Sequence, residues 1–164
     1  MITEEIINKW LSEVKSDLID NYYRLKLKAS GNWPNQLKED LVIGKDKYNA
    51  IIWGEKYTGA IEYGRLPNKN QNTDYLRRWA FGFGNSVIKK WCQDKGIDTK
   101  FAVSIAYKIA KEGWKVPNPH NDGGLVSDVM NKKIPELEKA LVFGFVEQIK
   151  TDLKNTLIHG YYSS

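Results

Sequence analysis

Apolar side chains in the first part of the chain recur every three or four residues, which is the spacing of one face of an α-helix. They keep this spacing from Ile6 to Leu25, over about six turns of helix. Thr3 can cap the N-terminal end, and Gly31 ends the pattern. The pattern therefore predicts a long amphipathic helix over residues 3–29.

Residues 37–64 change to short runs of β-branched and aromatic residues, separated by glycine and charged turn residues. The runs span residues 41–43, 48–53 and 58–63. This composition predicts a three-stranded antiparallel β-meander. On its third strand, the Glu62 carboxylate would face away from Ile61 and Tyr63, because side chains alternate along a strand. Gly64 would then let the backbone turn sharply off the strand.

Glycines and capping residues divide residues 73–113 into short helices, which form a helical insertion. The expected helices span about 73–82, 86–95 and 98–113. Gly96 and Gly113 end the second and third of them. The third helix is expected to turn five side chains inward: Phe101, Ala102, Ile105, Ala106 and Ile109. The second and third helices also have the order of a helix–turn–helix, a module of many DNA-binding regulators.

The segment 114–124 contains two prolines, two glycines and two asparagines, which together predict a long exposed loop. A short helix is expected at 125–130, directly after this loop. Pro135 suits the first position of a helix, because its missing N–H has no partner to lose there. A separate C-terminal helix is therefore expected over 135–158.

The C-terminal helix carries an apolar stripe with a spacing of four: Leu137, Leu141, Phe145, Ile149, Leu153 and Leu157. Each step of four turns the stripe by about 40°, because an α-helix repeats every 3.6 residues. One flat sheet cannot cover a stripe that winds in this way. We therefore expect the end with Leu153 and Leu157 to contact a neighbouring subunit.

Together these elements predict one α+β domain over residues 1–164. In this fold class, a small antiparallel sheet is packed by helices that are segregated from the strands along the sequence. Here the sheet would be the meander, and the packing would come from the long N- and C-terminal helices. The helical insertion and the long loop would lie between them.

The net charge of +5 is concentrated in one part of the chain. Residues 77–120 hold nine Lys/Arg and three Asp/Glu, a net charge of +6, whereas the other segments are close to neutral. The excess has two interpretations: solvated helix faces, or a surface for DNA or an acidic partner. The cations assigned to such a surface are Arg77, Arg78, Lys89 and Lys90. No apolar run reaches the roughly 18 residues that span a bilayer, so no membrane partner is expected.

Residues that could carry catalysis or bind a metal are few and scattered. His120 lies near Asp122 in the proline-rich loop, which offers too few ligands for a metal site. Cys92 is the only cysteine, so no intrachain disulfide is possible, and a buried position suits it better than a nucleophile's role. His159 suits a helix C-terminus as a cation. The sequence therefore predicts no enzyme, cofactor or metal, with a metal-dependent enzyme built on His120 as an alternative.

Two segments resemble a known family. Ala29-Ser30-Gly31-Asn32-Trp33 follows the long first helix, and Tyr57-Thr58-Gly59-Ala60-Ile61-Glu62-Tyr63-Gly64 follows two expected strands. With the order of the elements around them, they resemble the tail-completion family of tailed bacteriophages, which are head–tail connector (neck ring) proteins. In that family a strand ends in an aromatic–small–small–Glu–Tyr–Gly signature. The chain departs from the family pattern at Arg65-Leu66-Pro67-Asn68, directly after the signature glycine.

The resemblance implies a structural virion protein that forms a sixfold or twelvefold homo-oligomeric ring in the phage neck. Such a ring joins the portal or adaptor to the tail proteins, surrounds the DNA path with non-specific contacts, and is assembled in the host cytoplasm. The implied subunit contact is Glu62, Tyr63, Gly64 and Arg65, to which the winding stripe adds Leu153 and Leu157.

The alternative is a DNA-binding regulatory protein that uses residues 86–113 as a helix–turn–helix. The peak of positive charge favours it. Against it, the third helix of the insertion offers only Lys100, Lys108 and Lys111 outward, without the Arg, Asn or Gln side chains that read bases. A regulator would bind short duplex DNA with a steep dependence on salt.

Overall fold

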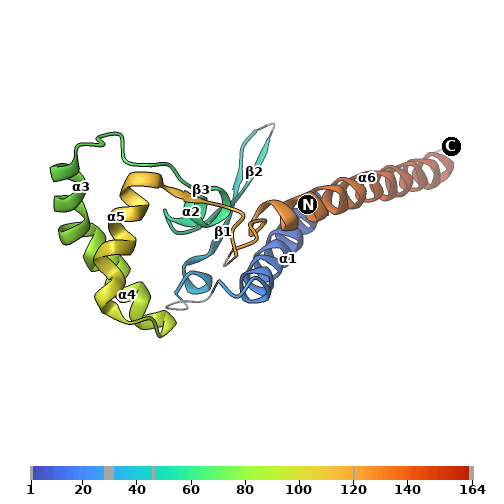
Figure 1. Cartoon of the computed structure of the whole chain (residues 1–164). Coiled ribbons are helices and arrows are strands. Elements are labelled where there is room, and N and C mark those ends of the chain that lie inside the picture. The colour runs from blue at the N-terminus through green and yellow to red at the C-terminus, as the bar shows by residue number, and fades with distance from the viewer. Residues whose placement is uncertain (1, 28–31, 46, 120, 163–164) are drawn as a thin grey trace. The chain divides into compact units, whose positions relative to one another are not determined.

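The computed structural model describes residues 2–27, 32–45, 47–119 and 121–162 (Figure 1). The protein is α+β, as expected, with long helices at both ends of the chain and two small antiparallel sheets. The sequence led us to expect one domain, and the chain forms two compact units. Unit 1 comprises Met1–Ile19, Leu37–Trp53 and Val126–Ser164, and unit 2 comprises Asp20–Gln36 and Gly54–Leu125.

Helix α1 spans Ile2–Arg24, so the expected end at residue 29 is wrong. The helix stops earlier because Lys26 adopts a left-handed conformation, with φ 53°. The N–H groups of Lys26 and Leu27 then turn back to the carbonyls of Tyr23 and Tyr22, which satisfies the last helical acceptors. The apolar stripe itself is buried as predicted, at Ile7, Leu11, Val14, Leu18 and Tyr22.

Only two of the three expected strands form. Strands β1 (Lys38–Ile43) and β2 (Tyr48–Trp53) pair in antiparallel register, with Leu41 opposite Ala50. The third is a helix, α2 (Thr58–Tyr63), so the predicted meander is a hairpin followed by a helical turn. Local and tertiary bonds favour the helix, because Thr58 Oγ1 donates to the Glu55 carbonyl and accepts from the Trp33 indole.

A second small sheet brackets the helical insertion in unit 2. Strand β3 (Gly64–Arg65) pairs with β4 (Trp114–Lys115), so the insertion begins and ends at neighbouring strands. Between them the chain forms, in order, α3 (Thr73–Trp79), the π-helix η2 (Ala80–Gly84), α4 (Asn85–Lys95), the 3-10 turn η3 (Thr99–Phe101) and α5 (Ala102–Glu112). The predicted insertion is therefore confirmed in outline.

Capping chemistry explains where these helices begin and end. The Asn72 side chain accepts from the backbone of Asp74 and Tyr75 at the start of α3. Asp98 accepts from the Lys100 N–H before α5, and Gly96 ends α4 in a left-handed conformation. The inward face of α5 is narrower than expected: its alanines Ala102, Ala106 and Ala110 are buried, Ile105 and Ile109 are half-buried, and Phe101 is exposed.

Trp33 belongs to unit 2 and is the largest of the fully buried side chains in the described part of the chain. Its ring stacks on Tyr22 with centroids 5.1 Å apart, and only 1% of the residue is exposed. Its indole N–H donates to Thr58 Oγ1 at 2.9 Å, so the polar end of the ring is satisfied inside the core. Trp33 thereby connects the end of α1 to the start of α2.

The segment 114–124, predicted as a long exposed loop, is exposed only in part. It starts as strand β4, and its later part is held by Asn121, which is buried. The Asn121 side chain donates to the Ile61 carbonyl at 2.7 Å and accepts from the Gly123 N–H at 3.0 Å. These bonds fix the loop against α2. His120 lies outside the described residues.

The C-terminal part is one helix, α6 (Ser127–Tyr162), instead of the two helices expected at 125–130 and 135–158. Pro135 lies inside it, so the proline does not mark a start. Helix α1 contacts α6 near this proline, where the Trp10 indole N–H donates to the Lys133 carbonyl at 2.8 Å. In Figure 1 the second half of α6 lies beside no other described element of unit 1.

Candidate interaction surfaces

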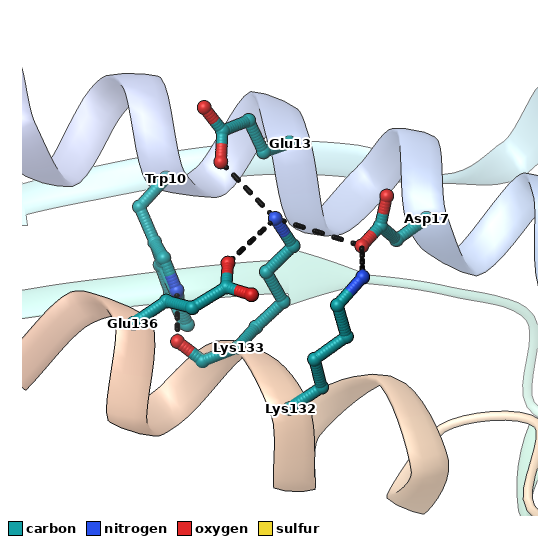
Figure 2. A network of polar contacts seen from close by, with 6 residues as sticks. All are labelled: Trp10, Glu13, Asp17, Lys132, Lys133 and Glu136. Atoms are coloured by element: carbon teal, nitrogen blue, oxygen red, sulfur yellow. Dashed lines mark hydrogen bonds and ion pairs between the residues drawn. The ribbon is translucent and has the colours of Figure 1, made fainter.

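A cationic centre joins α1 to α6 inside unit 1 (Figure 2). The Lys133 ammonium lies 2.9 Å from Glu136, 3.1 Å from Glu13 and 3.6 Å from Asp17. Only 9% of its side chain is exposed, whereas its three partners are partly solvated. The neighbouring Lys132 reaches Asp17 at 3.8 Å from an exposed position. Lys133 is thus a buried charge that is fully paired, as such charges must be.

This centre was not predicted from the sequence, although α1 carries Glu13 and Asp17 four residues apart, on one face. The hydrogen bond to Glu136 is the main reason that the pKa of Lys133 rises above its usual value. The same bond lowers the pKa of Glu136. A raised lysine pKa stabilises the fold at every pH below its ordinary value. A lowered glutamate pKa stabilises it above the ordinary glutamate value, and that part is lost as the pH falls.

We expect Lys133→Met to lower the free energy of unfolding by about 1–3 kcal/mol at neutral pH, because three carboxylates lose their common cation. Lys132→Met is the matched control. Its salt bridge is exposed, so a change within about 0.5 kcal/mol is expected. Urea denaturation followed by circular dichroism measures both. The Lys133 variant should also lose less stability than the wild type between pH 7 and pH 4; an equal loss would contradict the role assigned to Glu136.

The expected contact motif at 62–65 is not one surface. Glu62 is buried, with 6% of the residue exposed, so the expectation that its carboxylate faces outward is wrong. It fails because residues 58–63 are helical and do not alternate as a strand does. Tyr63 is 77% exposed. Gly64 turns the chain with φ 84°, and the Arg65 guanidinium stacks over Trp79 and donates to Asn68.

The four cations assigned to a DNA or acidic-partner surface, Arg77, Arg78, Lys89 and Lys90, are all exposed. They lie at the end of α3 and in α4, on either side of the π-helix η2. Two aromatic residues of η2, Phe81 and Phe83, are exposed between them and were not predicted as part of a surface. The second and third helices of the insertion do form, so the order of a helix–turn–helix is present in α4 and α5.

A run of exposed apolar side chains lies along α6, between residues 142 and 153. Six large side chains there are between 43% and 67% exposed: Val142, Phe143, Phe145, Val146, Ile149 and Leu153. Leu137 and Leu141, earlier on the predicted stripe, are half-buried, and the side chain of Leu157 lies outside the described residues. The stripe predicted from the sequence includes Phe145, Ile149 and Leu153 of this surface, and Val142, Phe143 and Val146 lie outside that stripe. We call these six residues the α6 apolar face.

Within the described residues, no group of three or more His, Cys, Asp and Glu is placed to hold a metal ion. Cys92 is buried, as expected for a small apolar residue. No described helix is both long enough and apolar enough to cross a membrane.

Comparison with known proteins adds no relative. No protein-family model, curated protein or solved structure matches the chain.

Proposed function

We propose that the protein is a structural assembly subunit that self-associates through the α6 apolar face. The observation that carries this proposal is the exposure of six large apolar side chains on one stretch of helix. Contiguous apolar patches of this kind mark interaction sites on soluble proteins. Covering such a face with a partner removes apolar area from water, which lowers the free energy of the helix.

The free energy gained by burying the α6 apolar face supports a stable contact. Burying one large apolar side chain is worth about 1.5–3 kcal/mol when it moves fully out of water. The six residues of the face start about half-exposed, so their joint burial still gives several kcal/mol before the cost of association is subtracted. The polar side chains that border the face bond within the helix, Lys150 to Glu147 and Gln148 to Asp152.

We further propose that this assembly is a ring in the neck of a tailed bacteriophage. The support is the resemblance in element order: a long N-terminal helix, a hairpin, a long connection and an apolar C-terminal helix. The helical form of residues 58–63 removes the strand in which the family signature would end. The proposal therefore rests on the element order and on the α6 apolar face, and not on the signature.

Replacing Ile149 and Leu153 together by serine is expected to abolish assembly and leave a folded monomer, because both side chains are exposed within the subunit. Multi-angle light scattering after size exclusion gives the mass over a range of concentrations, and circular dichroism monitors folding. The control is Thr151→Ser with Lys154→Ser, which changes two exposed residues outside the apolar face of the same helix. A wild-type protein that stays monomeric at high concentration contradicts self-assembly.

Electron microscopy of the assembled wild type then tests the ring. Closed rings with a central channel support the neck role. Small bundles without a channel contradict the neck role and leave the self-association in place. Tight, salt-sensitive binding of short duplex DNA by a monomer favours the regulator that uses α4 and α5 instead.

A further inference from the structure

Four exposed apolar residues of α6 have the heptad spacing of a coiled-coil seam. Val142, Val146, Ile149 and Leu153 are spaced by four, three and four residues, the spacing of alternating core positions in a coiled coil. Projected at about 100° per residue, the four side chains fall within roughly 60° of one another. The seam shares Ile149 and Leu153 with the stripe of strict fours that the sequence predicts. It differs from that stripe by including Val142 and Val146, which are exposed.

Two phenylalanines widen the seam beyond what one neighbouring helix covers. Phe145 lies about 60° to one side of Val142 and Phe143 about 100° to the other, so the apolar face spans about 160°. The interface of a two-stranded coiled coil is a narrow stripe. A face of this width is buried only when the helix contacts two neighbours.

The two edges of the face carry opposite charges. On the Phe145 side, Glu138 and Asp152 lie about 40° and 80° from Val142. On the Phe143 side, Lys139 and Lys150 lie about 60° and 80° from it. All four are exposed. Glu147 lies beyond Lys150 on the basic side and pairs with it at 2.8 Å.

This arrangement of charges favours a parallel over an antiparallel orientation of two neighbouring α6 helices. In a parallel pair, the acidic edge of one helix lies against the basic edge of the next. Glu138 then meets Lys139 and Asp152 meets Lys150 at nearly equal heights, within about 3 Å along the axis. An antiparallel pair places like edges together, lysine beside lysine and carboxylate beside carboxylate. Exposed charges add little affinity, but they set register and orientation.

The surface of α6 beside the basic edge is hollowed. This shallow hollow is lined by Glu138, Lys139, Val142, Phe143, Val146, Glu147 and Lys150. Residues spaced i, i+3, i+4 and i+7 form the holes that accept knobs in coiled coils, and 139, 142, 143 and 146 have this spacing. The set 143, 146, 147 and 150 repeats it. Phe145 of a parallel neighbour in the same register would lie at the height of these holes.

We propose that α6 packs in parallel against α6 of other copies of this chain, in a bundle of at least three helices. Each helix places its acidic edge and Phe145 on the basic edge of the next copy. The inference rests on the proposed self-association and adds to it the identity of the contacting helix, its direction and a minimum number of copies.

Cysteine cross-linking of the full-length protein tests the direction. Val142 and Leu153 mark the ends of the seam, and eleven residues separate them by about 16 Å along the helix. Both side chains are exposed, so Val142→Cys and Leu153→Cys should fold as the wild type does. Each variant is treated with a short bis-maleimide, alone and mixed with a size-tagged copy of the other variant. The wild type, whose Cys92 is buried, is the control.

A parallel bundle gives cross-links between identical positions in each variant alone and almost none between positions 142 and 153 in the mixture. Light scattering on the same samples should give a mass of three copies or more. Cross-links mainly between 142 and 153, or a mass of two copies, would overturn the proposal while self-association stands. An oligomer without any cross-link shows that another surface assembles it, which also overturns the proposal. A wild type that is monomeric contradicts the proposed function itself.

Discussion

Trp33→Ala is expected to lower the free energy of unfolding by about 3–5 kcal/mol, the usual cost of removing a buried tryptophan. Trp33 is almost fully buried, stacks on Tyr22 and donates to Thr58. The substitution therefore removes a large volume from unit 2, breaks a ring stack and leaves the Thr58 hydroxyl without its indole donor. Urea denaturation followed by far-ultraviolet circular dichroism measures the loss.

Trp53→Ala is the matched control for this prediction. Trp53 ends strand β2 and is 57% exposed, so its removal should change the stability by no more than about 1 kcal/mol. Because both variants lose the same side chain, their difference reports the burial of Trp33 together with its stack on Tyr22 and its bond to Thr58. Equal losses in the two variants would mean that Trp33 is not a buried core residue.

Gly64→Ala is expected to destabilise the protein by about 3 kcal/mol or more, through backbone strain together with a steric clash. Gly64 has φ 84° and ψ −165°, a conformation that residues with a side chain rarely adopt. An added Cβ would also lie 2.1 Å from the Trp114 carbonyl oxygen. That carbonyl belongs to β4, which pairs with β3 at this point. The variant must therefore distort the small sheet that brackets the helical insertion.

Gly59→Ala provides the comparison within the same helical turn. Gly59 lies inside α2, and nothing is found within 4 Å of where its Cβ would be placed. Alanine there should be neutral or should stabilise the protein by up to about 1 kcal/mol, because it favours the helix. Thermal unfolding of both variants provides the measurement. A Gly64 variant as stable as the Gly59 variant would show that the turn into β3 does not need glycine.

The elements that the sequence predicts well are those whose ends are set by local chemistry. Helices α4 and α5 end at Gly96 and Gly113, and Asp98 accepts a backbone N–H at the start of η3. Such contacts join residues a few positions apart, so they can be recognised in the sequence. The end of α1 lacks this signal, because a lysine and not a glycine takes the left-handed position.

Segment 58–63 was predicted wrongly because its composition suits a strand and its neighbours favour a helix. Ile61 and Tyr63 are typical strand residues, but the bond from Trp33 to Thr58 joins positions 25 residues apart. Pro135 is a comparable case. The proline suits a helix start locally, and helix α6 nevertheless begins eight positions earlier, at Ser127.

The candidate surfaces could be predicted only in part, because burial also depends on contacts between residues that are far apart in the sequence. An apolar stripe on α6 can be recognised from spacing, but spacing does not tell which of its residues the subunit covers. The structure half-buries Leu137 and Leu141 and leaves Phe145, Ile149 and Leu153 exposed. The Lys133 centre could not be predicted as a whole, because its carboxylates come from α1 and α6, about 120 residues apart.

The opposite charges on the two edges of α6 have a consequence for how assembly ends. A subunit that joins by its acidic edge leaves its own basic edge available, so every open intermediate can still accept a further subunit at both ends. A contact of this head-to-tail type stops adding copies only when the rotation between neighbours closes a circle; otherwise it continues as a filament. The angle between adjacent copies of α6, rather than the strength of their contact, would then determine the number of subunits.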